Sequence, residues 1–233
     1  MRTAFCAACL VLSTIATAQE APPVRRQPER LTPLDPYPES LSAKYFTALN
    51  RLLRVDETES SGLGGWRKAV TMIERPPFDP EWAVTLRERR GDGPELVLVS
   101  ASCNFWYSMP ENRDGGERGR KREKVHAEIQ EKAIDRARAD RMYALWERML
   151  RGVCYPDVDQ GGIEDATSYE FRWRQKRLYG EASSPEGGPA EALIEVGKAM
   201  ASVCRSAGDA DALASLDKAC DELEKRLAAV EKR

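Results

Sequence analysis

The stretch EWAVTLRERRGDGPELVLVSASC, residues 81–103, constrains the fold more than any other part of the chain. Large apolar side chains alternate with other residues in its first half, as they do on one face of a strand: Trp82, Val84 and Leu86. Gly91-Asp92-Gly93 supplies a turn, and residues 96–99 are apolar without interruption. The pattern predicts an antiparallel hairpin whose second strand is central in a sheet and covered on both faces.

Two further segments predict strands on either side of this hairpin in the sequence. Residues 66–75, WRKAVTMIER, are rich in strand formers and end at Pro76-Pro77. Residues 124–133 alternate between apolar and polar side chains, which favours a strand. A helix stays open there, because Val125 and Ile129 are also one helical turn apart.

An aromatic row in SYEFRWRQKRLYGEAS predicts a second hairpin, with its turn at Gln175-Lys176. Tyr169, Phe171 and Trp173 are two residues apart, and charged residues stand between them. The row fits the buried face of a strand, since aromatic residues are strong strand formers and are usually buried. A ligand platform is the alternative, because aromatic rings interleaved with basic residues also occur in binding proteins.

Four segments have the spacing of amphipathic helices. The first begins at Ser40, and the second is capped by Asp135 and ends at Gly152. The third has Pro189 at its first position and ends at Gly208, and the fourth is capped by Asp209. The last two should pack together as a C-terminal helical hairpin. We therefore expect an α+β fold with a mostly antiparallel sheet of about six strands and about four helices.

The N-terminal region predicts export and a separate tether. One basic residue precedes an apolar stretch from Ala4 to Ile15 and the sequence Ala16-Thr17-Ala18, which is the pattern of a secretory signal peptide cleaved after Ala18. The apolar stretch is about 12 residues, whereas a membrane-spanning helix needs roughly 20. Residues 19–39 are rich in proline and favour an extended tether. Residues 40–233 would then form a single α+β domain in a periplasmic or secreted protein, without a transmembrane segment.

Four cysteines follow the expected cleavage site: Cys103, Cys154, Cys204 and Cys220. An even number in an oxidising compartment predicts disulfides. We expect Cys204 to pair with Cys220 across the helical hairpin and Cys103 to pair with Cys154, although other connectivities stay open. No two of the four have the close spacing of a structural zinc site, so we expect no metal and no cofactor.

Few residues suggest catalysis. His126 is the only histidine and lies on the polar side of its segment, so a solvated position is expected. The stretch DVDQGGIEDATS has acidic residues at the first and third positions of a calcium loop, but Gly161 and Ser168 occupy positions that need ligands. An acidic connector is the simpler interpretation. The same stretch provides carboxylates for a hydrolase: Asp157, Asp159 and Glu164.

The charge of the chain limits its partners. A formal net charge of −2 excludes a nucleic-acid binder that acts through bulk positive charge. A short basic run could contact an anionic envelope surface or an acidic protein, or form a solvated loop: Arg118, Arg120, Lys121, Arg122 and Lys124. We expect an exported, non-catalytic protein that binds an envelope protein, of the inhibitor or immunity type. The alternative is a carboxylate-based envelope hydrolase.

Overall fold

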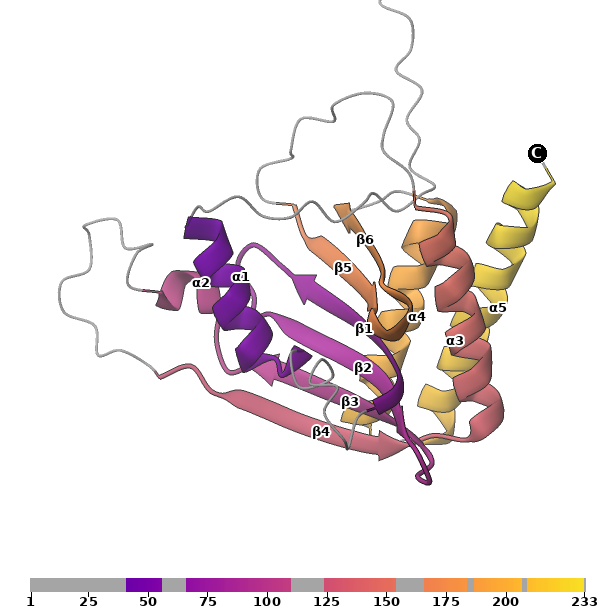
Figure 1. Cartoon of the computed structure of the whole chain (residues 1–233), viewed down its shortest axis with the longest axis horizontal. Helices are drawn as coiled ribbons and strands as arrows, with labels where there is room; N and C mark the ends of the chain where they lie inside the picture. The colour runs from indigo at the N-terminus through magenta and orange to yellow at the C-terminus, as the bar shows by residue number, and fades with distance from the viewer. Residues whose placement is uncertain are drawn as a thin grey trace, which may run out of the picture.

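The computed structural model describes residues 41–55, 66–109, 124–153, 166–183, 187–206 and 209–232. Within them, six strands form one antiparallel sheet in the order β4-β3-β2-β1-β5-β6 (Figure 1). The strands are β1 (Trp66–Arg75), β2 (Trp82–Arg89), β3 (Pro94–Ala101), β4 (Ala127–Ala133), β5 (Ser168–Trp173) and β6 (Leu178–Ser183). The helices are α1 (Leu41–Leu52), α2 (Phe105–Ser108), α3 (Arg136–Arg151), α4 (Gly188–Arg205) and α5 (Ala210–Glu231). The α+β prediction is confirmed.

The predicted hairpin is formed by β2 and β3, and β3 lies between β2 and β4. Residues Leu96 to Val99 are all buried, as expected for a central strand covered on both faces. Gly91 in the turn has φ of +94°, a conformation that glycine adopts easily. Residues 127–133 form the edge strand β4, so the helical alternative for this segment is wrong. Its exposed side chains match an edge position, where charged residues discourage further pairing.

One face of the sheet carries the larger core, covered by α3, α4 and α5 (Figure 1). The predicted caps of α3 and α5 are present, since Asp135 accepts a hydrogen bond from Arg138 N and Asp209 accepts one from Ala212 N. The last two helices pack along each other as the predicted hairpin. Gly197 lets α4 lie close to β1, because a Cβ at this position would meet the side chain of Met72. None of the described helices has both the length and the hydropathy that crossing a membrane requires.

The aromatic row belongs to this core, which confirms the first interpretation. Tyr169, Phe171 and Trp173 are all buried, and Phe171 has no exposed surface. Phe171 meets Trp146 of α3 edge to face, with ring centroids 6.0 Å apart. Trp173 packs against Tyr143 of the same helix at 5.7 Å. Each contact joins the sheet to α3, so the row fixes the position of the helical layer.

The opposite face of the sheet is covered by α1 and has a smaller apolar cluster (Figure 1). Tyr45 and Leu49 of α1, and Leu53 just after it, pack there against Ile73, Ala83, Val97 and Val99 of the sheet. Beyond the end of α1, this face carries polar and charged side chains, which line the hollow described below. We call the two sides the helical face and the open face.

The predicted disulfide between Cys204 and Cys220 is wrong, because both residues are free and buried thiols. Cys204 lies one residue before the end of α4, whereas Cys220 lies near the middle of α5. At about 1.5 Å per residue, Cys220 is more than about 10 Å beyond the part of α5 opposite Cys204. A disulfide needs Cα atoms within about 7 Å. Cys103 is also free, and its expected partner Cys154 lies outside the described residues.

Candidate functional site

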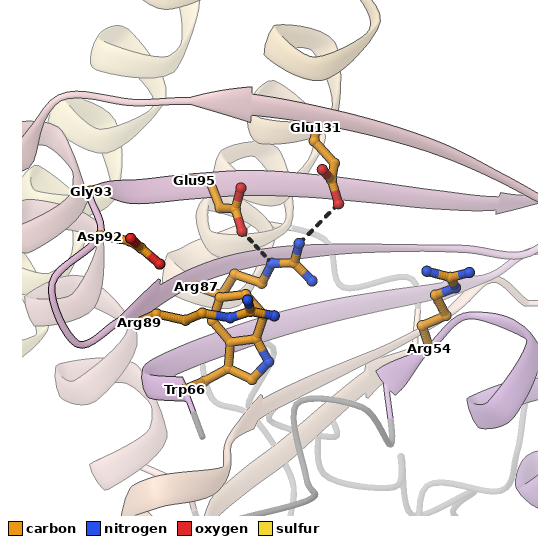
Figure 2. Close-up of a pocket in the computed structure, with 8 residues that line it drawn as sticks. All are labelled: Arg54, Trp66, Arg87, Arg89, Asp92, Gly93, Glu95 and Glu131. Carbon is orange, nitrogen blue, oxygen red and sulfur yellow. Dashed lines mark hydrogen bonds and ion pairs between the residues drawn. The ribbon is translucent and has the colours of Figure 1, made fainter. Parts of the chain in front are cut away.

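A hollow of about 530 Å³ opens on the open face, beside the β2–β3 turn (Figure 2). Its walls come from four separate stretches of the chain: the residues just after α1, the start of β1, the β2–β3 hairpin around its turn, and β4. The lining residues are Arg54, Trp66, Arg87, Arg89, Asp92, Gly93, Glu95 and Glu131. Their indole, guanidinium and carboxylate groups make this hollow the candidate functional site.

A β-bulge places Trp66 in the hollow. The register between β1 and β2 shifts between Trp66 and Lys68, so that Trp66 pairs with Arg89 and Lys68 pairs with Glu88. Side chains alternate between the two faces of a strand, and a bulge breaks that alternation. Trp66 therefore lies on the open face, although Lys68 and Val70 after it point toward the helices.

Two arginines of β2 stack on the indole ring. Arg87 and Arg89 are two residues apart and thus lie on the same face of the strand. Their guanidinium carbons are 4.2 Å and 4.0 Å from the centre of the Trp66 ring, and Figure 2 shows the three side chains grouped together. Cations at this distance from a tryptophan face are attracted by its electron-rich ring. The indole and the two guanidinium groups therefore hold one another in place.

Carboxylates on the neighbouring strands fix Arg87. Its Nε donates to Glu95 at 2.8 Å and its terminal NH2 donates to Glu131 at 2.9 Å (Figure 2). Glu95 is the cross-strand partner of Arg87 on β3, and Glu131 comes from β4. The side chain of Arg87 is only 14% exposed. These two carboxylates balance its charge, so Arg87 acts mainly as a structural support for the ring.

Arg89 and Arg54 provide the cationic groups of the site. Arg89 is exposed, and it makes no ion pair with any of the residues that the structure describes. Arg54 follows α1 in a left-handed backbone conformation, with φ of +56°, and brings a third guanidinium to the hollow. Arginine presents a planar fork of donors that matches the two oxygens of a carboxylate. The exposed Arg89 could therefore bind an anionic group beside the indole ring, in a hollow that Asp92, Glu95 and Glu131 also line.

A buried group of charges lies elsewhere on the open face. Glu170 of β5 has no exposed surface, and it pairs with Arg75 Nη1 at 2.7 Å and with Nε of Arg172. Burial alone would raise the pKa of Glu170, but the two guanidinium groups outweigh it and hold that pKa below its usual value. Arg75 also donates to Ser168 and lies 4.7 Å from the ring of Phe46 in α1. The group joins α1 to the sheet.

Glu74 is a carboxyl of the helical face whose pKa is raised. It stands between Trp82 and Tyr169 on the adjacent strands, and its Oε2 atom is buried without a hydrogen-bond partner. Burial raises the pKa of Glu74, whereas the charge of Lys198 on α4 acts to lower it. A carboxyl in this state keeps its proton more readily than a solvated one, which is a common property of catalytic acids.

Of the residues that the sequence pointed to for chemistry, those that the structure describes, His126 and Lys124, do not line this hollow. His126 is exposed just before β4, as expected, and its backbone N–H donates to Ser102. Asp157, Asp159 and Glu164 lie outside the described residues, as does the basic run apart from Lys124. No cluster of metal-ligating side chains occurs among the described residues.

Comparisons with protein-family models, with curated proteins and with solved structures found no match for this chain. The functional proposal therefore depends on the geometry and charge of the described residues.

Proposed function

We propose that this chain is an exported, non-catalytic binding protein whose partner is a protein of the cell envelope, as an inhibitor or immunity protein would be. The hollow on the open face would bind an acidic group of that partner. One observation carries this proposal: Trp66 is fixed by two stacked guanidinium groups, and one of them, Arg89, is exposed beside the hollow. Tryptophan and arginine are the residue types that contribute most to protein–protein affinity.

The hydrogen bonds that fix the side chains around the hollow favour binding. Arg87 is fixed by Glu95 and Glu131, so the ring and the arginine are oriented before a partner arrives. A preorganised surface loses less side-chain freedom on binding, which improves affinity. The two glutamates pair with Arg87, and their negative charge disfavours an anion of the partner on that side of the hollow. Arg89 is the exposed cation that stays beside the ring.

The test begins with capture of the partner by crosslinking from an envelope extract, followed by purification of both components. We expect Trp66→Ala and Arg89→Ala each to weaken the affinity for the purified partner by about 30-fold, the effect of losing a dominant interface residue. Arg90→Ala is the matched control, because Arg90 is exposed beside Arg89 but does not line the hollow. Equal binding by all three variants would contradict the proposal.

A carboxylate-based envelope hydrolase is the second candidate, and Glu74 is the observation that favours it. A carboxyl with a raised pKa could donate a proton to a leaving group. Under this hypothesis, turnover of peptidoglycan or of an ester substrate would be detectable and would be abolished by Glu74→Gln. Asp157→Asn, Asp159→Asn and Glu164→Gln would test the acidic stretch in the same assay. Activity that survives all four substitutions would exclude these carboxylates as catalytic groups.

A further inference from the structure

Two exposed aromatic rings stack at the end of the sheet opposite the hollow. Phe78, in the loop between β1 and β2, is 64% exposed, and Tyr107 of α2 is 55% exposed. They are the most exposed large apolar side chains among the described residues. Their ring planes differ by 6° and their centroids are 6.5 Å apart. Single exposed apolar residues are ordinary, whereas here two exposed rings lie together with parallel planes.

Asn104 fixes the two rings relative to each other. Its side-chain nitrogen donates to the backbone oxygen of Asp79 at 2.9 Å and to that of Pro77 at 3.4 Å. Its side-chain oxygen accepts from Tyr107 N at 3.3 Å. One amide thus joins the loop that carries Phe78 to the helix that carries Tyr107. The rings are held in place without contributing to the core themselves.

Glu81 also fixes α2, the helix that carries Tyr107. It is 1% exposed, and its carboxylate accepts hydrogen bonds from the backbone N–H groups of Phe105 at 2.7 Å and Trp106 at 3.2 Å. The hydroxyl of Tyr45 in α1 donates to the same carboxylate at 2.7 Å. These bonds satisfy N–H groups at the start of α2 that would otherwise lack partners. A buried carboxyl group therefore supports a helix of four residues that presents an aromatic ring to solvent.

The charge around the rings indicates what they could bind. The two segments that build the surface, residues 76–81 and 102–109, contain Asp79 and Glu81 but no lysine or arginine, in a chain with 36 basic residues. Glu81 is buried and engaged, whereas Asp79 is exposed next to Phe78. The faces of aromatic rings are themselves electron-rich. Both features favour a cationic group, and arginine in particular stacks flat on aromatic rings.

We propose that Phe78 and Tyr107, together with Asp79, form a binding site for an arginine side chain of a partner protein. This site is separate from the hollow around Trp66, which lies at the other end of β2. Eight residues of strand separate the two ends, a distance of roughly 25 Å at about 3.3 Å per residue. The inference goes beyond the proposed function, because it adds a second contact of opposite charge preference.

The probe is an acetylated and amidated Gly-Arg-Gly-Arg-Gly peptide, titrated into the full-length protein labelled for NMR. We expect its addition to shift the resonances of the Tyr107 amide and of the Trp106 indole N–H. Each ring should account for a two- to five-fold effect on affinity, roughly the range for exposed cation–π contacts. The Phe78→Ala, Tyr107→Ala double variant should therefore bind about ten-fold more weakly. Asp79→Asn should weaken binding by about two- to five-fold, since it removes the one exposed charge.

Four controls make the result decisive. Tyr107→Phe retains the ring and should bind as the unchanged protein does, and Tyr179→Ala removes an exposed aromatic residue of β6 and should have no effect. A peptide with citrulline in place of arginine retains the planar shape without the charge and should not bind. Arg89→Ala should leave peptide binding unchanged, so failure of this site is distinguishable from failure of the hollow.

Several results would overturn the inference. They are the absence of any shift with the arginine peptide, equal binding of the citrulline peptide, and unchanged binding by the double variant. Shifts of the same resonances by a neutral oligosaccharide but not by the arginine peptide would assign the rings to a glycan instead.

Discussion

The two faces of the sheet are stabilised in different ways. The helical face buries the aromatic row against α3 in the larger apolar core. The open face has a smaller apolar cluster under α1, a buried ionic group around Glu170 and a polar hollow around Trp66. Apolar packing stabilises a fold without directing it toward a ligand, whereas fixed charges and an accessible ring can select one. The difference indicates that the helical face mainly stabilises the fold, whereas under the proposed function the open face recognises the partner.

The largest effect is expected at the centre of the helical face. Phe171→Ala removes a ring without exposed surface that meets Trp146 and should cost about 3–5 kcal/mol of unfolding free energy. Urea denaturation measures this cost. Trp66→Ala is the matched substitution on the open face and should cost much less, because Trp66 is only partly buried. Similar losses for both variants would break the distinction between the faces.

Glu170→Ala should give the next largest effect, about 3 kcal/mol, because it leaves Arg75 and Arg172 without their shared carboxylate. The cost arises because the two arginines are left without their carboxylate, so replacing all three residues together should lower the unfolding free energy far less than Glu170→Ala does. We expect the variant Arg75→Met, Glu170→Leu, Arg172→Met to recover most of the lost stability in the same urea experiment. A triple variant that is no more stable than Glu170→Ala would show that the group acts through geometry rather than through charge balance.

The stabilisation from Glu170 should also depend on pH. Its folded-state pKa lies below the ordinary value of 4.5, so the contribution is complete above that pH and is lost as the pH falls through the folded-state pKa. We therefore expect the difference in unfolding free energy between the unchanged protein and Glu170→Gln to be constant near neutral pH and to shrink in acid. A difference that grows as the pH falls below 4.5 would have the wrong sign for a lowered pKa.

A smaller effect is expected at the start of α3. Asp135 caps this helix by accepting from Arg138 N at 2.9 Å, and Asp135→Ala should cost about 1 kcal/mol. The backbone hydrogen bond from Arg138 lowers the pKa of Asp135, so this contribution should also be lost in acid. Thermal denaturation near neutral pH measures the cost. Asp135→Asn retains a capping side chain and should recover most of it, whereas equal losses for both variants would exclude capping as the cause.

Regular alternation and helical spacing made much of the fold predictable. The hairpin of β2 and β3, the buried aromatic row and the caps at Asp135 and Asp209 each depend on residues that are close in sequence. The disulfide failed because the prediction ignored helix rise, which places Cys220 too far along α5 to meet Cys204. Counting residues from the turn would have excluded it.

The candidate sites could not be predicted in the same way. Glu170 stands between aromatic residues, so alternation assigns it to solvent, and its burial becomes reasonable only when Arg75 pairs with it from another strand. Trp66 faces the hollow because a bulge reverses the alternation of β1, and no local pattern marks that bulge. Phe78 and Tyr107 meet only because the β1–β2 loop and α2 lie at the same end of the sheet. These features depend on pairings between distant segments.

Hydrogen–deuterium exchange of the chain with and without its captured partner tests the central claim most directly. If the open face is the recognition surface, the partner should slow exchange in residues 87–95 and 127–133, beside the hollow, and leave the outer faces of α3 and α5 unchanged. Slower exchange confined to α3 and α5, with none around Trp66 and Arg89, would contradict the assignment of recognition to the open face.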